Sequence, residues 1–156
     1  MFRLPALHKV SGIAGMLLIA AFWTSTAVSE LFMTHADIAM VKTAILIAIP
    51  FLVVSMATAG ATGARLAGEK PTPWARRKQK RMMVAAANGM LVLVPAAIFL
   101  WWKTNAGAFD TAFYAVQAIE LVARPVNLVL LGLNARDGMR LASAKRARAA
   151  ASANTA

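Results

Sequence analysis

One segment of the chain, residues 109–133, is apolar enough to lie in a lipid bilayer and still carries four strongly polar side chains. These are Gln117, Glu120, Arg124 and Asn127. Their spacings of three and four residues place them on one face of an α-helix. Hydrocarbon cannot solvate such a stripe, so we expect it to face other helices or an aqueous cavity.

Composition and hydropathy predict an integral membrane protein. Of the 156 residues, 60% are hydrophobic and 15% are charged, and the mean hydropathy is +0.62. A helix needs about 20 mostly apolar residues to cross a bilayer. Four stretches meet this requirement: 10–32, 38–60, 82–102 and 109–133. The predicted fold is therefore all-α, a single domain of four transmembrane helices with a basic loop at 64–81 and a basic tail at 138–156.

The net charge of +11 is distributed as expected for a membrane protein rather than for a nucleic-acid-binding protein. With the N-terminus inside, 14 of the 17 basic residues fall on one side of the membrane, and basic residues gather on the cytoplasmic side. We assign Lys42 and Lys103 to the opposite side of the membrane and Arg124 to its interior. We therefore expect both termini in the cytoplasm, a bacterial-type inner membrane, and contact of the basic segments with anionic lipid headgroups.

The first span has an alternative interpretation as a secretory signal. Residues 1–29 have a basic start, an apolar run and small residues at 27–29 that resemble a cleavage site. The apolar run of residues 10–28 is longer than the roughly 7–15 residues of a signal core. We therefore expect this segment to remain as a transmembrane helix.

Short connections predict how the spans are joined. The segments 33–37 and 103–108 are so short that spans one and two, and spans three and four, should form two antiparallel hairpins in a small bundle. Thr34 or Asp37 can cap the second helix, and Asp110 can cap the fourth. Asn105 and Gly107 suit the end of the third helix. The pair Thr72-Pro73 predicts that the third helix begins at Pro73, with Trp74 at headgroup level.

The polar stripe extends into a longer seam along the fourth span. Its members are Asp110, Phe113, Gln117, Glu120, Arg124, Asn127, Leu131 and Asn134. Glu120 lies roughly 16 Å into the span at helical rise, and Arg124 follows it at i+4 in the order that favours an ion pair. Pro125 frees the carbonyl of Leu121, which Arg124 or a water can satisfy. The seam either holds helices together through interhelical hydrogen bonds or forms a ligand, proton or cofactor site.

Other residues of the spans suggest packing. Asn88 should face the same interior from the third span. Pro50 and Pro95 lie at similar depth to Pro125, which favours helix bends at one level. Small residues on the first span form a face for close helix contact: Ser11, Gly12 and Gly15.

Cofactor and metal sites receive little support. His8 and His35 are the two histidines and the weak candidates for haem b ligands, but they lie at opposite membrane faces and cannot clamp one haem in one subunit. Glu30, His35, Asp37 and Asp110 form a mixed ligand set for a divalent metal, although carboxylates near helix ends are usually caps. The absence of cysteine excludes thiolate sites. We predict no cofactor and no metal.

Three functions remain open. The first is an accessory or assembly subunit of a larger membrane complex, for example a respiratory one, whose seam docks a partner helix. The second is a homo-oligomeric small-solute or proton-coupled transporter, with Glu120 and Arg124 as the working pair. The third is a cytochrome b-like carrier of haem or quinone. No catalytic arrangement or nucleotide motif is present, so we do not expect an enzyme or a nucleic-acid partner.

Overall fold

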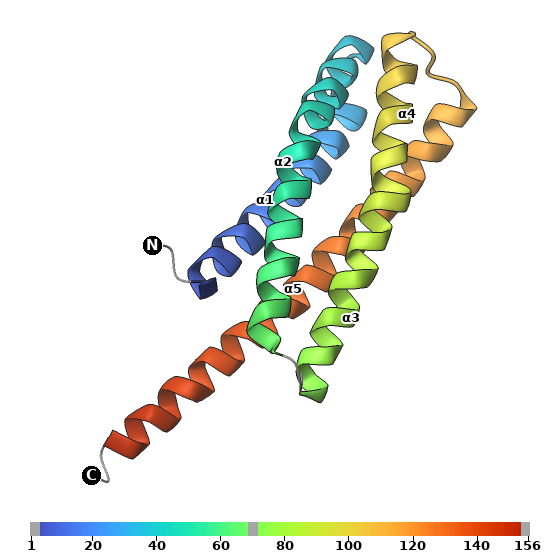
Figure 1. Ribbon diagram of the computed structural model, residues 1–156. Coiled ribbons are helices and arrows are strands. Elements are labelled where there is room, and N and C mark those ends of the chain that lie inside the picture. Colours follow the sequence, from blue (N-terminus) through green and yellow to red (C-terminus); the bar gives the residue numbers. More distant parts are fainter. Residues whose placement is uncertain (1–3, 69–71, 154–156) are drawn as a thin grey trace.

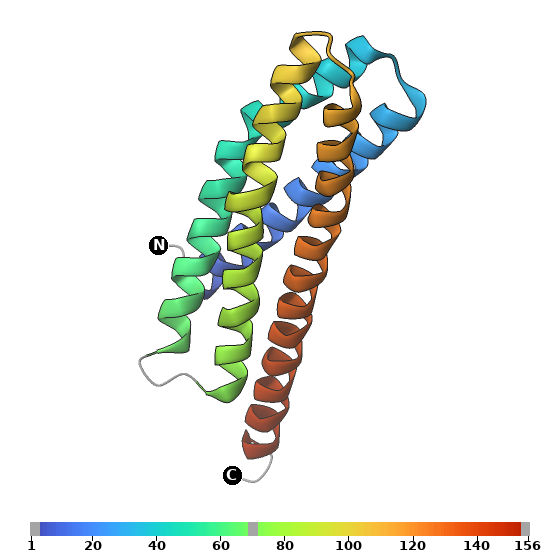
Figure 2. The same cartoon turned by 90° about the vertical axis from the view of Figure 1, so that its right-hand side faces the viewer.

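The computed structural model describes residues 4–68 and 72–153, and nearly all of them are helical (Figure 1). The segments are α1 (Leu4–Phe32), α2 (His35–Ala67), α3 (Pro73–Asn88), the π-helical η1 (Gly89–Leu93), α4 (Val94–Asn105) and α5 (Thr111–Ala153). Because α3, η1 and α4 follow one another without a break, the described chain consists of four long helices (Figure 2).

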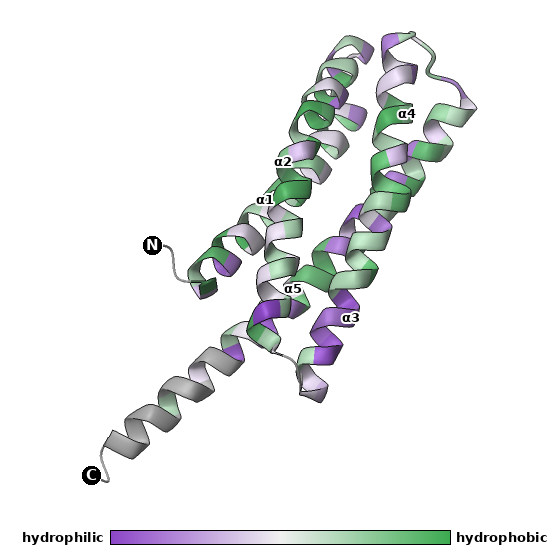
Figure 3. Cartoon of the chain, viewed as in Figure 1, coloured by the Kyte–Doolittle hydropathy of each residue, from purple (hydrophilic) through white to green (hydrophobic). Residues whose placement is uncertain are grey.

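All four helices are long and apolar enough to cross a membrane, as predicted. They are Leu4–Phe32, His35–Ala67, Pro73–Asn105 and Thr111–Arg140, with hydropathies of 1.6, 2.3, 2.1 and 1.5. The first three extend beyond the predicted spans, because helical hydrogen bonding continues into the polar flanks. The fourth begins at Thr111 rather than at residue 109, because Asp110 caps it. Hydrophilic residues gather at the start of α3 and on α5 beside it (Figure 3).

The predicted helix caps are present. Thr34 and Asp37 form a capping box at the start of α2. The Thr72 hydroxyl accepts a hydrogen bond from the amide of Ala75, so α3 begins at Pro73 as expected. These caps fix the residues at which α2 and α3 begin.

The end at which residues 33–34 join α1 to α2 and residues 106–110 join α4 to α5 is called here the short-loop end (Figure 1). Gly107 turns the chain there with φ of 65°. Asp110 accepts a hydrogen bond from Lys103 Nζ at 2.5 Å and one from the amide of Phe113 at 3.0 Å. These donors hold the pKa of the Asp110 carboxyl below its ordinary value.

The contacts between helices explain which faces are buried. Helix α1 packs on α2 and α5, α3 packs on α5, and α4 packs on α2 and α5. The small-residue face of α1 lies partly in the α1–α2 contact: Ser11 is buried, and a Cβ added at Gly15 would lie 2.8 Å from Met56 Sδ. Gly12, by contrast, has open space beside it.

Of the three prolines in the spans, Pro95 differs from the other two. Helices α2 and α5 continue through Pro50 and Pro125. Pro95 follows the π-helical segment η1, in which the amide of Val94 donates to the carbonyl of Gly89. A π-turn widens the helix locally, and local π adjustments are one way in which a membrane helix tolerates a proline.

Candidate functional site

The predicted polar stripe of α5 is buried inside the chain. Gln117, Glu120, Arg124 and Asn127 are exposed by 3%, 0%, 3% and 4%. Their partners lie on α1, α2 and α3, so the chain's own helices cover the stripe.

Lys42 of α2 is the partner that the sequence interpretation missed. We counted it to the outer side of the membrane, but it is 2% exposed, because its side chain faces Gln117 and Glu120 of α5. Its Nζ donates to Glu120 Oε2 at 3.0 Å and also to Gln117 Oε1. The available signal was its position within the apolar stretch 38–60, where a charge requires a partner.

The predicted ion pair between Glu120 and Arg124 is present. Arg124 Nη2 donates to Glu120 Oε1 at 2.5 Å, and Nη1 donates to the hydroxyl of Thr26 on α1 at 3.3 Å. The guanidinium also lies 5.8 Å from the centre of the Phe22 ring, within the range of a cation–π contact. Each Glu120 oxygen therefore has its own cation.

A second carboxylate completes the group. Glu30 Oε1 of α1 lies 3.8 Å from Lys42 Nζ, and its side chain is 11% exposed. Glu30, Lys42, Glu120 and Arg124 are called here the charge quartet. With all four ionised, their charges sum to zero, so the interior carries paired charge but no net charge.

A separate amide pair lies next to the charge quartet on α5. Asn88 Nδ2 donates to Asn127 Oδ1 and to the carbonyl of Ala123, each at 2.9 Å. Asn127 Nδ2 in turn donates to the carbonyl of Ala85 at 3.2 Å. Asn88 thus faces the interior as expected, and these bonds join α3 to α5.

The Leu121 carbonyl that Pro125 releases has a partner that we did not predict, while the hydrogen bonds of Arg124 go to Glu120 and Thr26. The Trp23 indole of α1 donates to the Leu121 carbonyl from Nε1 at 3.2 Å. The sequence did not single out Trp23, because its distance from Leu121 along the chain conceals the contact. Indole N–H groups are donors only and require an acceptor in a membrane.

An interhelical cavity of about 310 Å³ lies beside the charge quartet. Its walls come from all four long helices, and Arg124 and Asn127 are the polar residues among the described residues that line it. Val53 of α2 and Met90 of η1 also line it and are 37% and 55% exposed, so the cavity opens on the side of the bundle. The rest of its lining is apolar or glycine, including Gly60 and Gly89.

Arg124 lines the cavity and has hydrogen-bonding capacity beyond its two contacts with the described residues. A guanidinium has five N–H donors, and the contacts with Glu120 and Thr26 occupy two of them. Arg124 therefore contributes to the wall of an apolar, laterally open cavity a cation whose other N–H groups have no hydrogen-bond partner among the described residues. Such a wall can bind an oxygen acceptor or an anion whose remainder is apolar.

The two histidines lie at opposite ends of the bundle. His8 Nδ1 lies 3.0 Å from the carbonyl oxygen of Ala59, while the His35 ring stacks on Phe109 at a centroid distance of 3.9 Å. Neither ring lines the interhelical cavity.

Among the described residues, no group of three His, Asp or Glu side chains is close enough together to hold a metal ion. The structure therefore adds no support to the metal hypothesis. Each of the acids considered for it contacts another group: Glu30 the Lys42 ammonium, Asp37 the Thr34 cap, and Asp110 the Lys103 ammonium.

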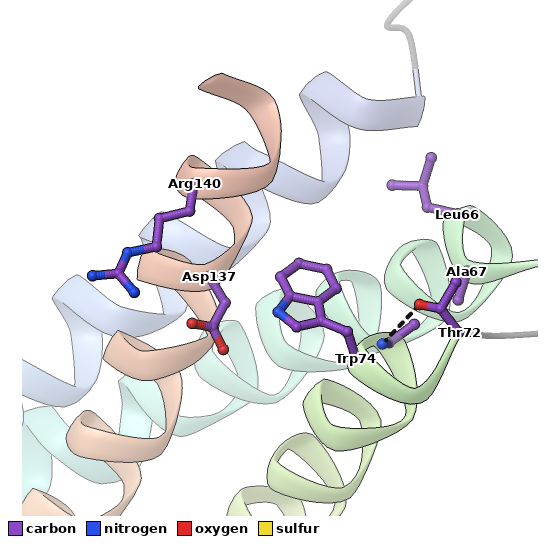
Figure 4. Close-up of a pocket in the computed structure, with 7 residues that line it drawn as sticks. Leu66, Ala67, Thr72, Trp74, Asp137 and Arg140 are labelled. Carbon is purple, nitrogen blue, oxygen red and sulfur yellow. Dashed lines mark hydrogen bonds between the residues drawn. The ribbon is translucent and has the colours of Figure 1, made fainter. Parts of the chain in front are cut away.

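A second hollow, of about 630 Å³, lies at the opposite end of the bundle from the short loops (Figure 4). It is lined by Leu66, Ala67, Thr72, Trp74, Ala75, Asp137 and Arg140. The Trp74 ring lies between Asp137 of α5 and the end of α2 (Figure 4). Arg81 donates to Asp137 at 2.7 Å, so the acid of this hollow is already paired.

No model of a known protein family matches this chain, and no curated protein or solved structure matches it significantly. The charge quartet and the cavity beside it are therefore the features of this chain that bear on its function.

Proposed function

We propose that this chain binds a lipid-soluble amphiphile within the membrane, with the polar head of the ligand at Arg124 and its apolar body in the interhelical cavity. The observation that carries the proposal is the placement of Arg124 in the wall of an otherwise apolar, laterally open cavity. Ligand sites commonly combine apolar walls with a few polar groups that orient the ligand. The lateral opening suits a ligand that arrives from the bilayer.

This proposal refines the transporter and quinone-carrier hypotheses. Glu120 acts as the counter-charge that holds the Arg124 guanidinium, and Arg124 contacts the ligand. The expected head group is a carbonyl, carboxylate, sulfonate or phosphate oxygen, because each of these accepts hydrogen bonds from a guanidinium. Haem is not part of the proposal, since His8 and His35 lie outside the cavity.

Filling the cavity tests the proposal. Gly60 lines the cavity and has nothing within 4 Å of an added Cβ, so Gly60→Leu should occupy ligand space without a backbone clash. We expect it to weaken binding of decylubiquinone and of 1-dodecanesulfonate by about tenfold or more, because the leucine side chain takes up space that the apolar body of the ligand would fill. A tenfold loss corresponds to about 1.4 kcal/mol. Isothermal titration calorimetry on the full chain in lipid nanodiscs measures this effect.

Gly12→Leu is the matched control. Gly12 is also a helical glycine with open space beside it, but it does not line the cavity. Its affinity for both probes should equal that of the wild type. Equal affinities in Gly60→Leu and Gly12→Leu would place the ligand elsewhere and refute the proposed site.

A subunit of a larger membrane complex is the second candidate. The polar stripe that we expected to dock a partner helix is covered by the chain itself, so the support comes from α5. This helix continues to Ala153, and its last turns project beyond the other described helices (Figure 1). A pull-down from native membranes, with and without residues 141–156, tests whether a partner is held by this projection.

We further infer that the two helix pairs are antiparallel hairpins in a bacterial-type inner membrane, with both termini and the basic segments in the cytoplasm. The chain has no cysteine, so single cysteines report position cleanly. In intact cells, an impermeant maleimide should label Asn105→Cys at the short-loop end and should label Ser143→Cys only after permeabilisation. The reverse pattern would invert the topology.

A further inference from the structure

We infer that an anionic ligand head binds at Arg124 together with one proton, which Glu30 takes up from the short-loop end. The inference rests on the proposed function, and it specifies how the charge quartet responds to a charged ligand. In the coupled step, the Glu30 carboxylate gains a proton and becomes a carboxylic acid, while the ligand keeps its negative charge.

Charge conservation in a buried site is the first reason. The charge quartet sums to zero, and three of its members are exposed by 3% or less: Lys42, Glu120 and Arg124. An anionic head would bring the sum to minus one in a region that solvates net charge poorly. Protonation of one carboxylate returns the sum to zero.

Contact geometry selects Glu30 over Glu120 as the proton acceptor. Glu120 has a cation at 3.0 Å on one oxygen and at 2.5 Å on the other, so protonating it would break two close ion pairs. Glu30 has one longer contact, 3.8 Å from Lys42. Its side chain is 11% exposed, whereas that of Glu120 is fully buried.

Unsatisfied polar atoms beside Glu30 could be hydrogen-bonded by a water. Glu30 Oε1 and Gln117 Nε2 are buried without a hydrogen-bond partner among the described residues. Lys42 Nζ lies next to both side chains, so a water there would find both hydrogen-bond acceptors and donors, as buried waters require. The charged and titratable groups that face Glu30 are Lys42 and His35 on α2 and Glu120 on α5.

The contacts also connect the two ends of the quartet. An anion at Arg124 competes with Glu120 for the guanidinium, so Glu120 depends more on Lys42. The Lys42 ammonium then stabilises the ionised Glu30 carboxylate less strongly. The Glu30 carboxylate therefore becomes easier to protonate. By reciprocal linkage, protonation of Glu30 strengthens anion binding.

Calorimetry with a permanently charged probe tests the inference. The sulfonate of 1-dodecanesulfonate does not take up a proton near neutral pH. Any proton taken up on binding is therefore bound by the protein. Titrations of the full chain in nanodiscs, in two buffers of different ionisation enthalpy, should show uptake of about one proton per sulfonate, and affinity should rise about tenfold per unit decrease in pH. Neutral decylubiquinone should bind without proton uptake.

Glu30→Gln should abolish the proton uptake and strengthen sulfonate binding at neutral pH, because the quartet then carries a permanent net charge of plus one. Asp110→Asn, which removes another carboxylate at the short-loop end, should retain about one proton per ligand. Saturable sulfonate binding by the wild type without proton uptake, or uptake that persists in Glu30→Gln, would overturn the inference alone. Failure of both probes to bind would refute the proposed function as well.

Discussion

Replacing Glu120 with glutamine is expected to lower the free energy of unfolding by about 3–5 kcal/mol, because it leaves buried cations without their counter-ion. Glu120 is fully buried and contacts both Lys42 and Arg124. In the variant, the remaining carboxylate of the quartet is Glu30, which lies 3.8 Å from Lys42. Two cations would then share one distant partner. Denaturant or thermal unfolding in mild detergent, followed by circular dichroism, measures the loss.

A double substitution separates charge from packing in this prediction. Lys42→Gln combined with Glu120→Gln leaves Glu30 and Arg124, whose charges cancel. The combined loss of stability should therefore be smaller than the sum of the two single losses, by about 0.5–3 kcal/mol. Strictly additive losses would mean that Lys42 and Glu120 do not interact as an ion pair.

Asp110→Asn is the matched carboxylate control for the same experiment. Asp110 also contacts a lysine, but its side chain is 52% exposed, and exposed pairs contribute little because water already solvates both charges. The variant keeps an oxygen that can cap α5. Its unfolding transition should lie close to that of the wild type, and a loss as large as that of Glu120→Gln would contradict the burial argument.

The sequence was most informative where one helix determines the answer. The spacing of Gln117, Glu120, Arg124 and Asn127 identified a buried stripe, and the i,i+4 relation identified the ion pair of Glu120 with Arg124. Caps such as Thr72 and Asp110 were equally predictable, because capping depends on residues a few positions apart. In each case the physics is local to a few turns of helix.

Contacts between helices were harder to predict. Helical period shows which residues share a face, but it does not show which neighbouring helix covers that face. Lys42 was therefore counted to the outer side of the membrane without its contact to Glu120, and Trp23 was overlooked as the donor to Leu121. The rule that a charge within an apolar stretch needs a partner would have placed Lys42 in the interior, but it would not have chosen between Glu30 and Glu120.

The interhelical cavity was also beyond the sequence, because it depends on gaps left by packing. Small residues such as Gly60, Ala86 and Gly89 contribute to its walls, yet small residues at other positions, such as Gly15, lie in close helix contacts. The π-helical segment η1 contributes Met90 and Leu93 to the same wall. Composition does not distinguish these outcomes, because each depends on the path of the neighbouring helix.

Replacing Arg124 with lysine is expected to weaken binding of 1-dodecanesulfonate and decylubiquinone by about 10- to 150-fold, which corresponds to the loss of a charged hydrogen bond worth about 1.5–3 kcal/mol. Lysine keeps the charge but replaces a planar fork with a single ammonium group. That group cannot hold Glu120 and Thr26 as Arg124 does and still offer donors to the cavity.

Arg81→Lys provides the matched control for this last substitution. Arg81 also forms an ion pair between helices, at 2.7 Å from Asp137, but it does not line the interhelical cavity. Probe affinity, measured by calorimetry in nanodiscs, should be unchanged in this variant. If Arg124→Lys binds both probes as tightly as Arg81→Lys does, the guanidinium is a purely structural partner of Glu120. The ligand head would then have to be sought away from the charge quartet.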